Sequence, residues 1–252
     1  MSYGEPLTPA RRVGRGLARA LAIVVVVLVL LTVAFLFYAN MVMRGERAQA
    51  VKAWTDPAVA VADLDNAIVL SPTGSANGVG LVFIPGAKVD PFAYLYKLSG
   101  IVEQGTTVVI TKPTLNLAFF DQRPLADFTA DAPAIDTWYV GGHSLGGVRA
   151  CQLADSPDVT GLVLFGSYCA NDLSDTSLAV LSISGSNDGL STPATIAAAK
   201  HELPADAAFT EIEGANHAAF GDYGVQPGDG TATITSAQAR DEITAALASF
   251  FG

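Results

Sequence analysis

The sequence of 252 residues has few charged residues, few cysteines and few histidines. Charged residues make up 15% of the chain and hydrophobic residues 50%, which excludes a disordered chain and leaves no basic stripe for binding nucleic acid. With 2 cysteines and 3 histidines, the chain has no cluster with zinc spacing. The nucleotide-binding patterns G-x-x-x-x-G-K and G-x-G-x-x-G are absent as well. We therefore expect no nucleic-acid partner, no metal and no cofactor.

What the sequence does contain is one long apolar run near its N-terminus. From Ala20 to Met43, only Thr32 and Asn40 interrupt the apolar residues. A helix of this length, at about 1.5 Å a residue, reaches about 36 Å and so crosses a hydrocarbon core of about 30 Å. The run is apolar on every side, whereas a buried helix of a soluble protein needs only one apolar stripe. We predict a transmembrane helix over residues 20–43, with the lipid bilayer as its partner.

The flanks of this run predict a retained anchor with a cytoplasmic N-terminus. A cleaved signal peptide has a shorter apolar core, of about 7 to 15 residues, with a small-residue cleavage site close behind it. Here the nearest A-x-A pattern behind the run, at 48–50, follows a charged segment. Four arginines precede the run: Arg11, Arg12, Arg15 and Arg19. The positive-inside rule then predicts a cytoplasmic tail over residues 1–19 and an extracytoplasmic domain at the cell membrane.

The remaining residues are expected to form a connector and one domain. Once Glu5 and the four arginines are set aside, 23 acids and 10 bases remain, a net charge of −13 against −10 for the whole chain. Residues 44–65 are polar and rich in alanine, which indicates a juxtamembrane connector. Residues 66–252 have the length of one ordinary domain.

Short apolar runs alternate with helix-period segments over this domain, as in βαβ units. We expect strands at 67–70, 79–84, 107–111, 137–140, 159–165, 180–184 and 209–212, and helices at 91–103, 145–153, 193–200 and 236–251. The alternation predicts an α/β fold with a mostly parallel sheet and helices on both faces. The first two strands flank the turn-rich segment 72–78, which favours an antiparallel hairpin at the sheet edge.

The strongest motif is a G-x-S-x-G sequence between an expected strand and an expected helix, Gly142-His143-Ser144-Leu145-Gly146. A serine on a sharp strand-to-helix turn presents its hydroxyl at the carboxyl edge of the sheet, and the flanking glycines let the backbone pass closely. The backbone N–H of the following residue then faces the reacting carbonyl. Ser144 is the candidate nucleophile and Leu145 a candidate donor of the oxyanion hole.

A serine hydroxyl is a weak nucleophile until a histidine accepts its proton and a carboxylate orients that histidine. His143 lies inside the motif and His201 ends a polar helix, whereas His217 follows the last expected strand. Asp188 falls on the turn after the preceding strand. Alone, an aspartate before glycine is usual in turns and a single histidine is usually structural. Their joint placement after successive strands favours a triad in the order Ser144, Asp188, His217.

At these motifs the chain resembles the α/β-hydrolase superfamily, and within it the small, lidless, dienelactone-hydrolase-like serine esterases, over residues 66–252. The segments that carry the likeness are 84–91, 142–147, 186–189 and 214–217. The resemblance implies that the oxyanion hole joins the N–H of Leu145 to that of Ala87, in the loop after the third strand. Dienelactone hydrolases proper have a cysteine nucleophile where this chain has Ser144, and Pro85-Gly86 replaces the usual His-Gly.

Lids in this superfamily usually enter after the strand that follows the nucleophile helix, and the chain between 165 and 180 is too short for one. We therefore expect no lid domain. The phenylalanines within 115–128 are read as ordinary core, with a partial apolar wall beside the site as the alternative. The segments 221–224 and 228–230 are read as turns, because they lack the acidic spacing of a calcium loop.

The predicted function is that of a membrane-anchored serine hydrolase that cleaves a small-molecule ester of a carboxylic acid through an acyl-enzyme. Two alternatives stay open: an acyltransferase that uses the same triad, and a non-catalytic surface binding protein with the same fold. The sequence also leaves open the substrate, the oligomeric state, and whether Cys151 and Cys169 form a disulfide or remain thiols.

Overall fold

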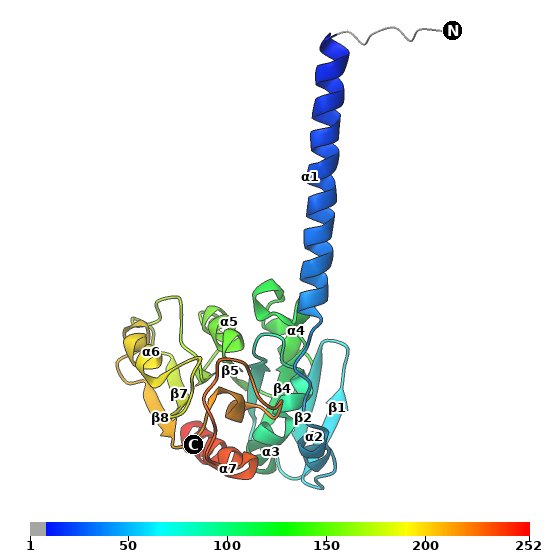
Figure 1. Cartoon of the computed structure of the whole chain (residues 1–252). Helices are drawn as coiled ribbons and strands as arrows, with labels where there is room; N and C mark the ends of the chain where they lie inside the picture. Colours follow the sequence, from blue (N-terminus) through cyan, green and yellow to red (C-terminus); the bar gives the residue numbers. More distant parts are fainter. Residues whose placement is uncertain (1–8) are drawn as a thin grey trace, which may run out of the picture. The chain divides into compact units, whose positions relative to one another are not determined.

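The computed structural model describes residues 9–252. The chain divides into an N-terminal unit that ends at Met41 and a second unit that spans Val42–Gly252. Figure 1 shows the elements of both units.

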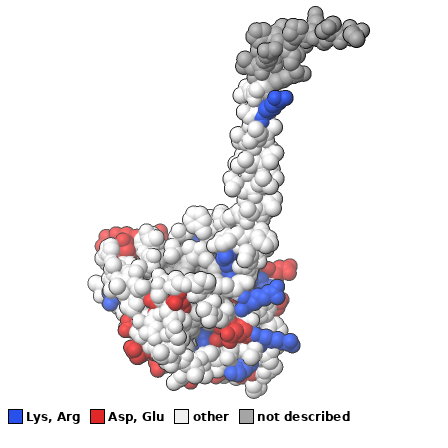
Figure 2. Space-filling view, in the orientation of Figure 1, with Lys and Arg blue, Asp and Glu red and all other residues white. Residues whose placement is uncertain are grey.

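The N-terminal unit is one helix, α1 (Pro9–Ala39). Its stretch Gly16–Ala39, 24 residues, is long and apolar enough to cross a membrane. In Figure 2 most of α1 is a column without charge colour, unlike the second unit. Helix α1 ends at Ala39, four residues before the end of the predicted span of 20–43, and the Asn40 side-chain amide donates to the carbonyl of Leu36 at 2.8 Å in its last turn. Of the expected tail, residues 9–19 are helical and residues 1–8 lie outside the described residues.

The second unit is built on one eight-stranded sheet in the order β1-β2-β4-β3-β5-β6-β7-β8. The strands are β1 (Val59–Asp63), β2 (Ala67–Pro72), β3 (Val79–Ile84), β4 (Thr107–Thr111), β5 (Thr137–His143), β6 (Gly161–Phe165), β7 (Ala179–Gly185) and β8 (Ala208–Ile212). Strand β2 runs antiparallel to β1 and β4, and every pair from β4 to β8 is parallel. The prediction of a mostly parallel sheet is confirmed.

The prediction of an antiparallel hairpin between residues 67–70 and 79–84 is wrong. Strand β4 lies between β2 and β3, so the turn-rich segment 72–78 is a crossover and does not join neighbouring strands. The true hairpin partner of β2 is β1, which the sequence pattern did not reveal. Strand β1 has a weak apolar signal, because it alternates valine with alanine and buries only Val59.

Residues 44–65, expected as a connector, contain β1 and helix α2 (Arg47–Trp54). Ala53 of α2 is buried, and the Trp54 ring lies 6.2 Å from that of Phe92. This segment therefore belongs to the folded second unit.

Helices cover both faces of the sheet (Figure 1). Helices α2, α3 (Leu95–Glu103) and α7 (Ser236–Phe251) pack on one face, and α4 (Ala126–Thr129) and α5 (Leu145–Leu153) on the other. Leu81 and Phe83 belong to the first core and Val82 and Ile84 to the second, as the alternation of side chains along a strand requires. The central strands are thus buried on both faces.

The remaining helices are short: α6 (Pro193–Ala198), η1 (Pro91–Tyr94), η2 (Thr114–Asn116), η3 (Ala118–Phe120), η4 (Lys200–Glu202) and η5 (His217–Phe220). The helix expected at 91–103 is therefore a 3₁₀ turn followed by α3. Between β6 and β7 the described chain holds neither helix nor strand, and no lid domain is inserted there.

Candidate active site

Ser144 stands at the sharp turn where β5 ends and α5 begins. Its backbone has φ 53° and ψ −124°, a conformation that a non-glycine residue adopts only when its surroundings enforce it. Its N–H donates to the carbonyl of Phe165 at 3.1 Å. A Cβ at Gly142 would collide with the backbone of Gly146, and one at Gly146 with the carbonyl of Ile84. The glycines of the motif therefore permit the tight turn that exposes the serine hydroxyl.

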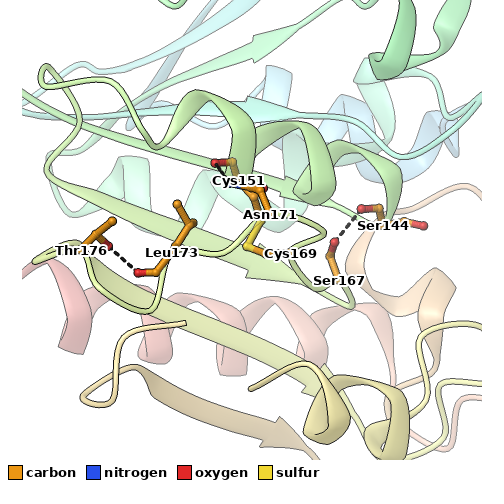
Figure 3. The surroundings of a disulfide bond; sticks show 7 residues. All are labelled: Ser144, Cys151, Ser167, Cys169, Asn171, Leu173 and Thr176. Carbon is orange, nitrogen blue, oxygen red and sulfur yellow. Dashed lines mark hydrogen bonds between the residues drawn. A yellow bond between two sulfur atoms is a disulfide. The ribbon is translucent and has the colours of Figure 1, made fainter. Parts of the chain in front are cut away.

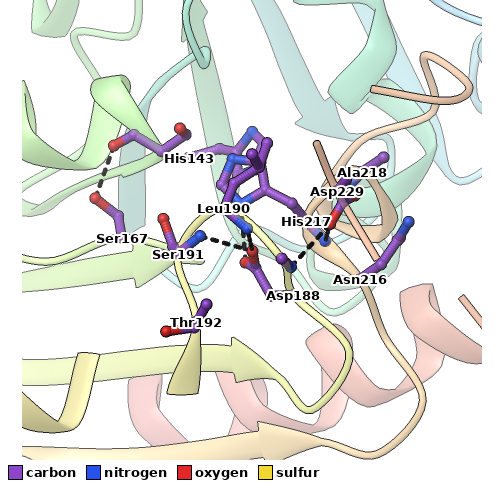
Figure 4. Close-up of polar contacts among 12 residues, drawn as sticks. His143, Ser167, Asp188, Leu190, Ser191, Thr192, Asn216, His217, Ala218 and Asp229 are labelled. Carbon is purple, nitrogen blue, oxygen red and sulfur yellow. Dashed lines mark hydrogen bonds and ion pairs between the residues drawn. The ribbon is translucent and has the colours of Figure 1, made fainter. Parts of the chain in front are cut away.

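His217 and Asp188 meet in the loops after β8 and β7 (Figure 4). The Nδ1 atom of His217 lies 2.8 Å from Oδ2 of Asp188, and both side chains are buried. The other carboxylate oxygen of Asp188 accepts the N–H groups of Leu190 at 2.8 Å and Ser191 at 2.7 Å. Three donors around one buried carboxylate hold it in a fixed direction toward the imidazole.

The second ring nitrogen of His217, Nε2, is buried and has no hydrogen-bond partner among residues 9–252. Because Nδ1 faces a carboxylate, Nε2 is the atom that can accept a proton. The His143 ring, one residue before Ser144, lies with its centroid 4.4 Å from that of His217. The structure therefore brings the His217–Asp188 pair to the turn that carries Ser144, although no hydrogen bond joins Ser144 to His217 in the described part of the chain.

His143 is fully buried behind this pair. Burial, and then the proximity of His217, lowers the pKa of His143 well below its ordinary value, so its ring is neutral. The hydroxyl of Tyr94 lies 2.9 Å from Nδ1 of His143 and accepts the N–H of Gly86, also at 2.9 Å. Burial raises the pKa of Tyr94, which keeps its proton available for His143. Tyr94 thus ties the turn before Ser144 to the loop after β3.

That loop, residues 85–90, is called the oxyanion loop below. Four of its amide groups are used: Gly86 donates to Tyr94, Lys88 to the carbonyl of Asn116, Val89 to that of Gly86, and Asp90 to that of Met43. Within residues 9–252, the N–H of Ala87 has no hydrogen-bond partner. The same holds for the N–H of Leu145, in the first turn of α5. The two amides expected to form the oxyanion hole are thus both unoccupied donors.

Sequence reasoning missed Asp229, which joins the two loops that carry the pair. Its Oδ1 accepts the N–H groups of Gly189 at 3.1 Å and His217 at 3.0 Å, and its Oδ2 that of Ala218 at 2.9 Å. The position of Asp229 between two glycines predicts a turn, and no local pattern distinguishes a turn aspartate from one that binds distant amides. Asp229 fixes the loop after β7 against η5.

Two contacts join the nucleophile turn and α5 to the loop after β6 (Figure 3). Ser167 donates from its hydroxyl to the carbonyl of Ser144 at 2.7 Å. Cys151 and Cys169 form a disulfide with a Cα–Cα distance of 5.6 Å. The disulfide thus decides between the two alternatives that the sequence left open.

Across residues 9–252 we find no group of three or more His, Cys, Asp or Glu side chains arranged to hold a metal ion. The chemistry that the described residues can support is nucleophilic attack by a hydroxyl, with an imidazole as base and backbone amides as charge stabilisers.

Comparison with known proteins adds one finding. A model of the alpha/beta hydrolase family matches residues 80–241, well over half of the chain, and the matched range includes Ser144, Asp188 and His217. No curated protein matches the sequence. With its mostly parallel sheet and a serine at the turn after β5, the chain belongs to the alpha/beta hydrolase family.

Proposed function

We propose that the protein is a membrane-anchored serine hydrolase that cleaves carboxylic esters through an acyl-enzyme. The observation that carries this proposal is the buried contact of 2.8 Å between His217 and Asp188, next to a serine held in a strained strand-to-helix turn. Family membership supports a hydrolase, and the geometry of these three residues supports a triad of Ser144, His217 and Asp188.

In the proposed reaction, Ser144 Oγ attacks the ester carbonyl carbon while Nε2 of His217 takes the hydroxyl proton. Asp188 stabilises the resulting imidazolium and does not itself take up the proton. The tetrahedral intermediate collapses when the carbon–oxygen bond to the alcohol breaks, and the imidazolium returns its proton to that alcohol. Water then gives a proton to His217 and attacks the acyl carbon. The bond between that carbon and Ser144 Oγ breaks, the imidazolium returns the proton to Oγ, and the acid leaves.

The negative charge that forms on the carbonyl oxygen is stabilised by hydrogen-bond donors that are not already paired with another group. The N–H groups of Ala87 and Leu145 meet this condition, and each such donor is worth about 10²- to 10³-fold in kcat. The carbonyl oxygens of Ile84 and Pro85 lie directly over Gly146, which brings the oxyanion loop against the first turn of α5. This close approach supports a shared oxyanion hole.

The substrate is proposed to carry an apolar group. Three large apolar side chains are exposed in segments that contact α5 or the candidate triad: Phe119 in η3, which packs against α5, Tyr168 next to Ser167, and Leu190, whose N–H binds Asp188. Phe119 is 67% exposed, which favours the apolar wall over the core packing that the sequence suggested. With no lid domain between β6 and β7, such a group would bind in an open site.

An extracytoplasmic position at the cell membrane is part of the proposal. The 24-residue apolar stretch of α1 has the length of a membrane span, and arginines precede it. A disulfide between Cys151 and Cys169 is typical of an oxidising compartment and rare in the cytosol.

The test is turnover of a panel of short and long acyl esters by the full chain and by Ser144→Ala. We expect the variant to lose several orders of magnitude in kcat, because only binding and oxyanion stabilisation remain. A fluorophosphonate should label the wild-type chain and not the variant.

Ser177→Ala is a matched control, because it removes an exposed serine hydroxyl in the segment between β6 and β7. Near-native esterase activity in Ser144→Ala would refute the proposal. Labelling without hydrolysis, but with transfer of acyl groups to added alcohols, would favour the acyltransferase, and absence of both would favour the binding protein.

A further inference from the structure

The five residues that follow the N-terminal unit, Val42–Glu46, lie against the oxyanion loop, and we call them the strap. The N–H of Met43 donates to the carbonyl of Lys88 at 2.7 Å, and the carbonyl of Met43 accepts the N–H of Asp90 at 2.9 Å. Met43 and Val89 thereby form an isolated parallel bridge. The strap adds one strand residue to the loop that carries Ala87.

Further contacts fix the strap against the segments that hold Asp222 and Ala93. The N–H of Glu46 donates to the carbonyl of Asp222 at 2.6 Å. A Cβ at Gly45 would lie 2.8 Å from the backbone nitrogen of Ala93, so only glycine fits against η1. The strap is therefore fixed on both sides of Met43, by the oxyanion loop and by the segments next to it.

The residue that the strap holds is strained. Lys88 has φ 56°, in the left-handed region that is unfavourable for a residue with a Cβ. Such a conformation persists only where its neighbours enforce it. Two hydrogen bonds do so here: the N–H of Lys88 donates to Asn116 at 2.7 Å, and its carbonyl accepts from Met43 at 2.7 Å.

Lys88 directly follows Ala87, whose N–H is the unoccupied donor of the loop. The Lys88 N–H lies in the peptide plane that joins Ala87 to Lys88, and the Ala87 N–H lies in the plane before it. A change in the backbone of Lys88 therefore turns the shared plane and displaces Ala87. The direction of the proposed oxyanion donor thus depends on a bond from a residue that comes only four positions after the end of α1 at Ala39.

We propose that the strap is a positioning element of the oxyanion hole: the backbone of Met43 fixes Lys88 and Asp90, and so aims the N–H of Ala87 at the reacting oxygen. This inference rests on the proposed function. An enzyme cut free behind Met43 keeps its candidate triad and loses both of these bonds.

The first test is Met43→Pro in the full chain in detergent, with Met43→Leu as its control. Proline removes the N–H that binds Lys88, whereas leucine keeps the backbone and a side chain of similar size. We expect about tenfold or more loss of kcat in the proline variant with little change in KM, since the oxyanion forms only in the transition state. A trifluoromethyl ketone, whose serine adduct carries an oxyanion, should bind about tenfold more weakly. The variant Met43→Leu should leave kcat, KM and the affinity for the ketone unchanged.

A second pair of variants keeps the test valid if proline disturbs folding. Gly45→Ala pushes the strap off Ala93, whereas Gly74→Ala adds the same Cβ at a position with no atom within 4 Å. We expect Gly45→Ala to lower kcat and leave KM unchanged, and Gly74→Ala to behave like the wild type.

Amide hydrogen exchange over residues 86–91 gives a readout that does not need turnover. Faster exchange in Met43→Pro and Gly45→Ala, together with the selective loss of kcat, supports the proposal. Unchanged exchange in both variants overturns it, as does faster exchange with wild-type kcat and ketone affinity. A wild-type chain without esterase activity or fluorophosphonate labelling refutes the proposed function, and with it the catalytic role of the strap.

Discussion

At the scale of single residues, the site is held together by side chains that take no chemical step. Asp229 accepts amides from both loops that carry the candidate pair, and Tyr94 joins the turn before Ser144 to the oxyanion loop. These contacts run between residues far apart in the sequence and leave no spacing pattern. The roles of Ser144, Asp188 and His217 could be proposed from the sequence, because each follows a strand in a recognisable order.

Asp229→Ala is expected to lower kcat by about tenfold to a hundredfold, because the displaced His217 ring no longer meets the serine at the productive distance. Asp229→Asn should recover part of the loss, since its amide oxygen can still accept the amides of Gly189 and His217. Asp155→Ala, at an exposed position, is the control. Steady-state kinetics decide: a purely structural residue would lower the amount of folded enzyme and leave the kcat of the folded fraction unchanged.

His143 makes stability depend on pH. Burial, and then the proximity of His217, lowers the pKa of His143 well below its ordinary value of about 6.5. As the pH falls below about 6.5, the unfolded chain binds a proton here and the folded chain does not, so the free energy of unfolding falls. The limit for one such group is about 1.4 kcal/mol per pH unit.

The matching measurement is urea unfolding of wild type and His143→Gln from pH 7 to pH 5. The difference in free energy of unfolding between the two should shrink by up to about 2 kcal/mol toward pH 5, because only the wild type has this group. His201→Gln removes an exposed histidine and serves as the control. A constant difference between wild type and His143→Gln would show that His143 does not contribute.

At the scale of elements, the sequence predicted where strands and helices form better than which strands pair. The expected helices at 145–153 and 236–251 match α5 and α7 in their bounds, since apolar periodicity is a local signal. Strand order is not local. No residue pattern between 72 and 78 indicates that β4 lies between β2 and β3. Strand β1 is mostly exposed and lacks a continuous apolar run, so its sequence resembles a connector.

The disulfide joins the last turn of α5, at Cys151, to the loop after β6 and is expected to stabilise the folded chain there. It closes a loop with a sequence separation of 18, which corresponds to about 3 kcal/mol. Cys151→Ser with Cys169→Ser should lower the free energy of unfolding by about this amount, and dithiothreitol should lower it in the wild type alone. Two reactive thiols in the unreduced, unfolded wild type would contradict the pairing.

At the scale of the whole molecule, the proposed arrangement is one membrane span and one outward catalytic unit. Protease added to intact cells should digest a tag at the C-terminus, and the full chain should stay with the membranes in alkaline carbonate. Both expected results follow from the apolar stretch Gly16–Ala39 and the arginines before it. A cytoplasmic marker protein must survive the same digestion. A tag that is protected until the cells are lysed would place the catalytic unit inside.

The close backbone contacts at Gly142 and Gly146 also bear on how this enzyme can evolve. No side chain fits at either position without moving the backbone opposite it, so both are closed to substitution. Exposed side chains such as Phe119 and Leu190 meet no such restriction. Directed evolution toward new esters should therefore accumulate its changes in the loops around η3 and after Asp188, and a randomised library gains nothing by including the two glycines.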